Sequence, residues 1–301
     1  MKSIPSDINK RKHLQMKYCI IIPTRNEEKF IGQTLQSIVG QSFLPSEVII
    51  VNDNSTDKTA EIVNEFSLKF PFMKIIHSGN QENKHEPGSK IIEAFYKGFD
   101  ELKSNWDVVT KLDADVILPS DYFEKIILSF EINPKIGIAG GLVYINKNEE
   151  WIYEKISNKK HVRGAIKSYS RACFIKMGGV KKSIGWDTVD ELLAQFYGFE
   201  IAVFSDLKVK LLKPTGNDYK KIHGQKTGSG FYKMDYGWLI SLIAALKASW
   251  NSKNPNLFFS ISKGYWNSAL KHDNKIVTKE EGKFIRTYRW KKILNRFVNH
   301  S

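Results

Sequence analysis

Short apolar runs alternate along the first half of the chain with segments whose apolar residues recur at helical spacing. The run Tyr18–Pro23 (YCIIIP) is continuous and closed by proline, which is typical of a buried strand. Over 31–39 the apolar residues fall at i, i+4, i+7 and i+8, which places them on one face of a helix. The pattern therefore predicts a strand followed by a helix.

The same alternation continues as far as about residue 130. We predict further strands at Val48–Val51, Lys74–His77 and Val108–Leu112. Helices are predicted around 62–66, over Lys90–Leu102, and after Asp121, whose side chain we expect to cap the helix. Strands that alternate with helices of this length form βαβ units, so we predict an α/β fold with a mostly parallel sheet flanked by helices.

The second half of the chain is mixed. We predict strands at Ile138–Val143 and Ala202–Phe204, with a helix that ends at Tyr197 between them. Beyond Gly216 the chain becomes basic and aromatic, and Phe231–Trp250 is predicted to be one amphipathic helix.

The composition narrows the class of protein. A chain of 301 residues allows one large domain or two small ones, and 42% hydrophobic with 26% charged residues is typical of a globular protein. Its two cysteines, Cys19 and Cys173, do not build a disulfide framework, which indicates a reducing compartment. The first 17 residues lack the apolar core of a secretory signal, and the longest apolar stretch, Trp238–Leu246, is far shorter than the ~20 residues of a membrane span.

The net charge of +14 favours an anionic partner. A phosphate-bearing small molecule, an acidic membrane surface and a nucleic acid all fit this balance. The excess is concentrated near the end of the chain, because the residues from Lys271 onward carry a charge of +6.

Polar and mostly acidic residues follow three of the predicted strands. They are Pro23–Glu27, Asn52–Asn54 and Asp113–Asp115. In a sheet of parallel strands, ligands bind beyond the carboxyl ends of the strands. We therefore expect these three segments to meet at one ligand-binding edge.

Asp113 and Asp115 are two residues apart, so at a strand end they project to the same side. Carboxylates without nearby Cys or His suit a hard cation such as Mg²⁺ or Mn²⁺, whereas the alternative is a solvated turn. Asp53 could accept hydrogen bonds from a base or a ribose, or it could merely close an Asx turn.

Two other phosphate-binding motifs are excluded. No G-x-G-x-x-G follows the first strand, and Gly88-Ser89-Lys90 has the wrong order for a Walker loop. Lys90 at a helix start is a candidate contact for a phosphate or a sugar; otherwise it is a surface lysine.

Three segments together resemble the family 2 glycosyltransferases, the large inverting group with the GT-A fold. They are Ile20–Glu28 (IIIPTRNEE), Val48–Asp57 (VIIVNDNSTD) and Lys111–Asp115 (KLDAD). The resemblance covers about residues 18–215. It implies an N-terminal extension over 1–17, a GT-A (Rossmann-like) domain over 18–215 with a nucleotide-sugar half (18–116) and an acceptor half (117–215), and a basic, aromatic-rich helical C-terminal region over 216–301.

The resemblance also implies a binding site for a nucleotide-sugar donor, such as a UDP-, GDP- or TDP-sugar. The resemblance implies that Asp113 and Asp115 hold a divalent cation, Mn²⁺ or Mg²⁺, on the diphosphate. The residues expected to bind the nucleotide-sugar, with Lys90 added from its place at a helix start, are Pro23, Thr24, Arg25, Asn26, Glu27, Asp53, Lys90, Asp113, Ala114 and Asp115.

From the same family resemblance we expect a catalytic base near a helix start, about eleven residues before a glycine. Counting back from Gly198 leads to Asp187, but Trp186 replaces the glutamate that the family has there, so Asp190 and Glu191 remain rivals. A cap of the helix is the structural alternative for Asp187. Many members also have a His after the last strand of the domain; this chain has Leu211-Leu212-Lys213 there, and His223 is a weak substitute.

These features predict an inverting, metal-dependent glycosyltransferase, because one base and one in-line displacement invert the anomeric centre. The expected acceptor is a glycan or a lipid-linked sugar in bacterial surface polysaccharide biosynthesis, and the expected location is the cytoplasm or the inner face of the plasma membrane. The C-terminal region either lies on an anionic membrane or packs as a core helix followed by a solvated basic helix.

The sequence disfavours two other functions. A sugar-nucleotidyltransferase would need a Gly-rich basic loop after the first strand, and a nucleic-acid-binding protein would need a basic ligand edge rather than an acidic one. A catalytically inactive GT-A scaffold is the remaining alternative. The sequence leaves the donor sugar, the acceptor and the oligomeric state open.

Overall fold

The computed structural model describes residues 15–79, 89–155, 158–213 and 224–298, and the chain divides into two compact units. The first unit comprises Met1–Val180 and Tyr197–Pro214. The second comprises Lys181–Phe196 and Thr215–Ser301. The segment 181–196, which the predicted domain over 18–215 includes, therefore belongs to the second unit.

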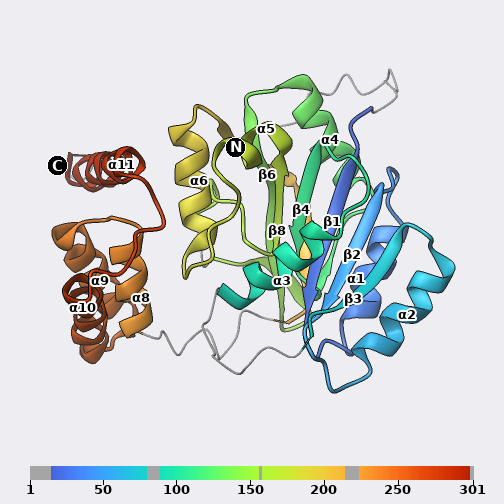
Figure 1. The fold of residues 1–301 in the computed structure, drawn as a ribbon, viewed down its shortest axis with the longest axis horizontal. Helices are drawn as coiled ribbons and strands as arrows, with labels where there is room; N and C mark the ends of the chain where they lie inside the picture. Colours follow the sequence, from blue (N-terminus) through green and yellow to red (C-terminus); the bar gives the residue numbers. More distant parts are fainter. Residues whose placement is uncertain (1–14, 80–88, 156–157, 214–223, 299–301) are drawn as a thin grey trace. The chain divides into compact units, whose positions relative to one another are not determined.

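The first unit is built on a mixed, mostly parallel sheet in the strand order β3-β2-β1-β4-β8-β6-β9-β5, with β7 paired to β6 (Figure 1). Strands β3, β2, β1 and β4 run parallel to one another, and so do β6 and β9, whereas β8 and β5 run antiparallel to their neighbours. The strands are β1 (Tyr18–Thr24), β2 (Glu47–Asn52), β3 (Met73–His77), β4 (Val108–Leu112), β5 (Val116–Ile117), β6 (Ile136–Lys147), β7 (Glu150–Tyr153), β8 (Ile166–Ser170) and β9 (Glu200–Leu211).

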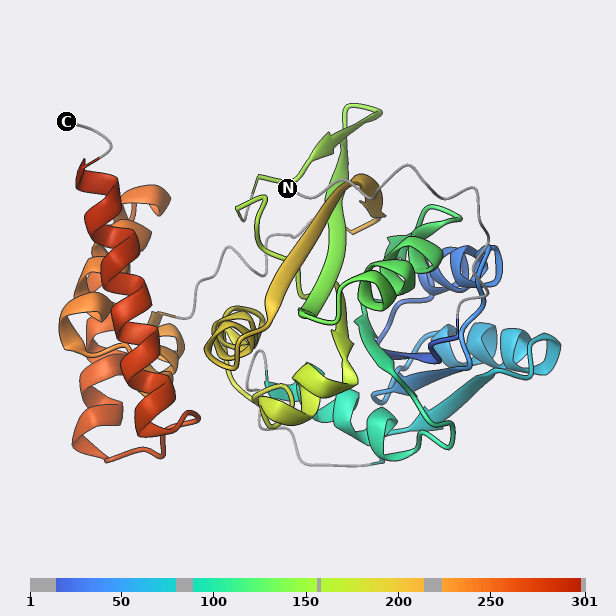
Figure 2. The same ribbon diagram turned by 90° about the horizontal axis from the view of Figure 1, so that it is seen from above.

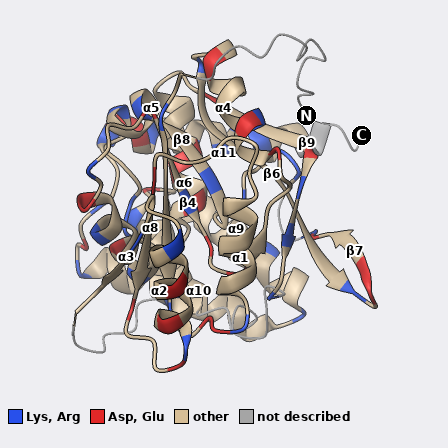
Figure 3. Cartoon of the chain, turned by 90° about the vertical axis from the view of Figure 1, so that its right-hand side faces the viewer, with Lys and Arg blue, Asp and Glu red and all other residues tan. Residues whose placement is uncertain are grey.

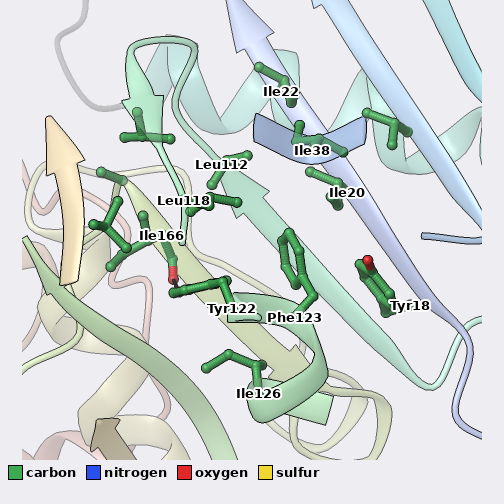
Figure 4. Close-up of a cluster of buried hydrophobic side chains, with 14 of the residues drawn as sticks. Tyr18, Ile20, Ile22, Ile38, Leu112, Leu118, Tyr122, Phe123, Ile126 and Ile166 are labelled. Carbon is green, nitrogen blue, oxygen red and sulfur yellow. Dashed lines mark hydrogen bonds between the residues drawn. The ribbon is translucent and has the colours of Figure 1, made fainter. Parts of the chain in front are cut away.

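Helices cover both faces of this sheet. One face carries a single large core in which Ile20 and Ile22 of β1 pack with Ile38 and Phe123 from helices α1 and α4 (Figure 4). On the other face α3 lies close against the strands, because a Cβ at Gly98 would come within 2.7 Å of Ile21. The helices of this unit are α1 (Ile31–Val39), α2 (Thr59–Lys69), α3 (Ser89–Asp100), α4 (Tyr122–Ile132) and α5 (Arg171–Lys176).

The predicted strands and helices of the first half are all present, and the α/β fold with its mostly parallel sheet is confirmed. The pattern did not reveal β5, β7 and β8, which are short, and it underestimated the length of β9. The expected cap was wrong: the Asp121 side chain makes no capping hydrogen bond. Its Oδ2 instead lies 2.7 Å from Nζ of Lys125, one turn further along α4.

The second unit is helical. Figure 2 shows α11 as a long helix beside the shorter helices that precede it. The predicted single helix over Phe231–Trp250 was wrong, because α8 ends at Lys233 and α9 begins at Trp238. Asp235 and Gly237 have positive φ (55° and 76°), which an α-helix does not allow, so the chain turns between the two. The helices are α6 (Trp186–Phe196), α8 (Gly224–Lys233), α9 (Trp238–Ser252), α10 (Pro255–Leu270) and α11 (Lys279–Val298).

Close packing within this unit depends on small residues. A Cβ at Gly228 of α8 would lie 1.9 Å from the backbone oxygen of Ile261 in α10, and a Cβ at Gly264 would lie 2.0 Å from that of Gln225. Ser268 and Ser229 are hydrogen-bonded across the same interface. Because these glycines lack a Cβ, the two backbones approach one another directly.

Charged residues of both signs lie over the surface, as at the tip of the β6–β7 hairpin (Figure 3). Among the described residues, no helix has the length and the apolar character needed to cross a membrane.

Candidate functional site

The three acidic segments follow neighbouring strands of the first unit, as the sequence predicts. Strand β1 pairs with β2 on one side and with β4 on the other. The backbone N–H of Asp53 donates to the carbonyl of Thr24 over 2.8 Å, which joins the ends of β1 and β2 directly. The carboxyl ends of β1, β2 and β4 thus form one edge of the sheet, and we call it the strand-end site.

The loops that follow β1 and β2 hold one another in place. Asn26 has a left-handed backbone (φ 54°), which asparagine tolerates better than most residues. Its N–H donates to Oγ of Ser55 over 3.0 Å, and its Oδ1 accepts the N–H of Thr56 over 2.8 Å. The N–H of Glu27 donates to Oγ1 of Thr59 over 2.8 Å. These bonds give the loop after β1 a defined shape before any ligand is present.

Asp53 is half-buried, and its Oδ1 accepts a hydrogen bond from Oγ of Ser78 over 2.6 Å. The local turn is closed by other residues: the N–H of Ser55 donates to Oδ1 of Asn52, and the N–H of Thr59 donates to Oδ1 of Asp57. Asp53 therefore does not close the Asx turn that was its structural alternative.

The turn that carries Asp113 and Asp115 is held by its backbone. The N–H of Asp113 donates to the carbonyl of Ala165, and the carbonyl of Asp115 accepts the N–H of Leu212, each over 2.8 Å. Oγ1 of the buried Thr34 donates to the carbonyl of Ala114 over 2.8 Å and accepts the N–H of Val116 over 3.1 Å. These hydrogen bonds fix the backbone on both sides of the two aspartates, and both aspartate residues are partly exposed.

Two lysines lie among these carboxylates. Lys111 is 1% exposed, and its ammonium donates to Oδ1 of Asp113 and, over 3.0 Å, to the carbonyl of Gly164. Lys213, just after β9, places its Nζ 3.2 Å from Oε1 of Glu27. A buried ammonium is stable only with such partners, so Lys111 is fixed in this position.

The electrostatics show that Glu27, Asp113 and Asp115 lie near one another. The pKa of Asp115 is raised to about 7, first by burial and then by the negative charges of Asp113 and Glu27, which outweigh the opposing charges of Lys111 and Lys213. Burial also raises the pKa of Glu27 against the opposing charge of Lys213. Oε2 of Glu27 is buried and has no hydrogen-bond partner among the described residues. The three carboxyl groups of this cluster therefore carry more negative charge than the two lysine ammonium groups neutralise.

The remaining predicted binding residues differ in exposure. Pro23, Thr24 and Ala114 are buried, whereas Arg25 is exposed. Lys90 is half-buried in the first turn of α3, and no hydrogen bond or ion pair joins it to the described residues of the strand-end site.

The predicted catalytic residues belong to the second unit. Asp187 is half-buried inside the first turn of α6, which begins at Trp186, so it is not the residue that caps the helix. Asp190 is fully buried, and its Oδ1 accepts the N–H of Glu191. Beside them, burial raises the pKa of the Tyr236 phenol; the charge of Asp187 raises it and that of Arg289 lowers it. His223 lies outside the described residues.

The sequence analysis missed Thr34, Ser78 and the role of Lys111. The signal for Lys111 was a charged residue in the middle of an apolar strand (VVTKL). Nothing in the pattern could reveal Thr34, because it contacts residues 80 positions away.

The described residues contain no group of three or more His, Cys, Asp or Glu side chains in a metal-binding arrangement. The strand-end site has an aspartate pair, Asp113 and Asp115, with Glu27 near them.

Solved structures share this fold. The TarS protein of S. aureus, in complex with UDP-GlcNAc, superposes with a TM-score of 0.56 at 17% identity, over 90% of this chain and 78% of that one. The mannosyltransferase PcManGT from Pyrobaculum calidifontis, in complex with GDP-Man and Mn²⁺, gives a TM-score of 0.54 at 15% identity, over 90% and 79%. The fold is that of the GT-A glycosyltransferases.

The sequence comparison defines the family. The model of Glycosyl transferase family 2 matches residues 19–179, more than half of the chain, and this protein belongs to that family. The poly-β-1,6-N-acetyl-D-glucosamine synthase of Staphylococcus epidermidis is 27% identical over 208 residues, which are 69% of this chain and 43% of that protein. The chain thus spans less than half the length of this relative.

Proposed function

We propose that this protein is an inverting glycosyltransferase that transfers a sugar from a nucleotide-diphosphate-sugar to a glycan or a lipid-linked acceptor. The observation that carries the proposal is the strand-end site, where three polar segments distant in sequence meet on adjacent strands. Asp53 and the loop over 23–27 would bind the base and ribose, and Asp113 and Asp115 would face the diphosphate. Lys90 is proposed to contact the donor from the start of α3.

The donor class follows from the relatives. TarS was solved with UDP-GlcNAc and PcManGT with GDP-Man, which supports a UDP- or GDP-sugar here, with a TDP-sugar as the third candidate. The similarity to a poly-β-1,6-N-acetyl-D-glucosamine synthase supports a role in polysaccharide biosynthesis. We further propose that this is a bacterial surface polysaccharide and that the protein acts in the cytoplasm or at the inner face of the plasma membrane.

A divalent cation, Mn²⁺ or Mg²⁺, fits the strand-end site. The buried Oε2 of Glu27 has no hydrogen-bond partner in the part of the chain that the structure describes. Burial and the neighbouring carboxylates raise the pKa of Asp115, so a cation would relieve an existing excess of negative charge. Asp113 and Asp115 would hold it. When bound, such an ion stabilises the charge that develops on the departing diphosphate.

Asp187 is the residue we propose as the catalytic base. A base must reach the acceptor hydroxyl, and Asp187 is partly exposed, whereas Asp190 is 0% exposed and Glu191 is 9% exposed. Asp190 remains the second candidate. Because one base takes the proton and no covalent intermediate forms, the anomeric centre inverts.

The donor can be identified by thermal unfolding with a panel of UDP-, GDP- and TDP-sugars, with and without Mn²⁺. We expect one sugar nucleotide to raise the Tm only with the metal and to be hydrolysed slowly without acceptor. The Asp115→Ala variant should lose both effects. Asp121→Asn, which alters a carboxylate that makes no capping bond, is the matched control and should keep them. The proposal fails if no nucleotide stabilises the wild-type protein with any divalent ion.

The base is tested separately. Asp187→Asn should still be stabilised by donor and metal but should lose turnover by about 10²–10⁴-fold. Full activity in this variant would exclude Asp187 and shift the assignment to Asp190 or Glu191. Donor binding without any hydrolysis or transfer, in the wild type as in the variants, would point to an inactive scaffold.

A further inference from the structure

Helix α9 of the second unit differs from an ordinary surface helix in the side chains that it exposes. The residues that it buries are Ile240, Ser241, Ala245 and Ser249, three of which are small. Ile240 faces inward and Leu242 is partly buried, but the other five large apolar side chains of α9 are exposed. They are Trp238 (54% exposed), Leu239 (42%), Ile243 (36%), Leu246 (61%) and Trp250 (82%).

The exposed side chains of α9 form a continuous stripe. Leu239, Ile243, Leu246 and Trp250 fall at i, i+4, i+7 and i+11, which places them on one face of the helix. A single exposed apolar residue needs no explanation, but a stripe of four that extends over about three helical turns marks a surface that is covered in use.

Helix α10, which packs against α9, carries a second stripe. Phe259 (68% exposed), Trp266 (48%) and Leu270 (78%) fall at i, i+7 and i+11, and the position between the first two on that face is Lys263. The opposite face of α10 packs on α8 through Gly264. Helix α10 also buries Leu257, Ile261 and Tyr265, so unlike α9 it has large apolar side chains on its inner face as well as on its exposed one.

The charge pattern identifies the occupant of these faces. From Gly237 to His272 the chain contains no Asp or Glu, and it contains Lys247, Lys253, Lys263 and Lys271, all of them exposed. A surface that binds another protein would be expected to have charged residues of both signs at its rim. Exposed tryptophans and leucines beside lysines alone are complementary to a bilayer surface with anionic headgroups.

We infer that the outer faces of α9 and α10 form a docking surface for an anionic lipid bilayer, with the helices lying in the plane of the headgroups. Neither helix is long and apolar enough to cross the membrane, so the contact is interfacial. Tryptophan favours this depth, because its ring is apolar and its N–H is polar. The inference goes beyond the proposed transfer reaction and does not depend on it.

The test is co-sedimentation of the full chain with vesicles of phosphatidylcholine alone or mixed with phosphatidylglycerol. We expect binding to the anionic vesicles, weak binding to the neutral ones, and a decrease as salt is added. Leu246→Ser combined with Trp250→Ser should lower the partition coefficient by at least about tenfold, because the variant lacks two apolar side chains that the bilayer would bury. Both side chains are largely exposed, so the variant should fold, which circular dichroism will verify.

The matched control is Leu68→Ser combined with Ile175→Ser. These side chains are as exposed (88% and 63%) but lie on α2 and α5 of the first unit. The control should bind vesicles like the wild type. The inference is overturned if the wild type does not bind anionic vesicles, or if the Leu246/Trp250 variant binds them equally well. It is also overturned if sedimentation velocity shows a dimer that this variant dissociates, because the faces would then belong to a second copy.

Discussion

Nζ of Lys213 lies 3.2 Å from Oε1 of Glu27, so a residue just beyond the last strand of the first unit pairs with the loop after its first strand. The pair spans 186 positions of sequence. It also places a positive charge among carboxylates, where Lys213 lowers the pKa of both Glu27 and Asp115. Lys213 occupies the place where the family resemblance led us to look for a histidine.

We predict that Lys213→Ala binds Mn²⁺ more tightly than the wild type. Removal of the lysine charge leaves the cluster of Glu27, Asp113 and Asp115 more negative. The ammonium is largely exposed and therefore screened, so the gain should be about two- to fivefold in affinity. Free Mn²⁺ measured by electron paramagnetic resonance during a titration gives this value. Lys210→Ala, which removes an exposed lysine near the end of β9, is the control; weaker Mn²⁺ binding by Lys213→Ala would contradict the prediction.

The raised pKa of Asp115 predicts an unusual pH dependence of stability without metal. Its pKa is 3.8 in the ordinary state and about 7 in the folded protein, so between these values the folded state keeps a proton that the unfolded state has lost. The free energy of unfolding should therefore fall as pH rises from about 4 to about 7 and change little above that, in so far as Asp115 determines it.

The Asp115→Asn variant isolates this effect. It should match the wild type near pH 4 and be the more stable protein near pH 8, as measured by urea unfolding in the presence of a chelator. Asp206→Asn, on the exposed surface of β9, should show the wild-type dependence. An Asp115→Asn variant that is less stable than the wild type near pH 8 would show that the carboxylate is stabilised by its surroundings.

Thr34 should act as a positioning residue for the aspartate turn. Thr34→Val keeps the shape but leaves the carbonyl of Ala114 and the N–H of Val116 without their partner, so we expect a loss of about 1–3 kcal/mol in the free energy of unfolding. Nucleotide-sugar affinity should fall as well, because the backbone of the turn is released. Ser37→Ala, which removes a hydroxyl bonded only to the preceding turn of α1, should leave that affinity intact. Equal affinities in both variants would refute the positioning role.

The contact of α3 with the sheet should not tolerate a methyl group. Gly98→Ala would bring a Cβ within 2.7 Å of Ile21 and 2.8 Å of Val51, and overpacking of this kind costs about 1–3 kcal/mol. Gly32→Ala in α1 has its nearest neighbour at 3.7 Å and should be neutral or stabilising by up to about 1 kcal/mol. Urea unfolding of both variants measures the difference; a stable Gly98→Ala variant would mean that α3 packs more loosely than described.

Much of the first unit could be predicted because its signals are local. The apolar run Tyr18–Pro23 and the helical spacing over 31–39 each lie within a few residues, and the structure contains both elements. The adjacency of the strand ends also followed, because the βαβ rule constrains which strands are neighbours. The short strand β8 was missed, since its pairing with β4 and β6 depends on residues far away in the sequence.

The second half shows the opposite case. The spacing over Phe231–Trp250 suggested one helix, but the positive φ of Asp235 and Gly237 divides it. The outward face of α9 could not be read from the sequence either, because the same leucines and tryptophans would look identical in a buried helix. Which face of α9 turns inward is set by its packing on α10, where Ala245 lies in one buried cluster with Leu257 and Ile261.

The sequence by itself determined most elements of the α/β unit, the acidic character of its strand ends and the family to which the chain belongs, because hydrophobic periodicity and short motifs are properties of neighbouring residues. Only the tertiary structure decided that Lys111, Lys213 and Thr34 take part in the strand-end site and that α9 presents its large apolar side chains outward. Those outcomes depend on contacts between residues tens to hundreds of positions apart, and such contacts exist only once the chain has folded.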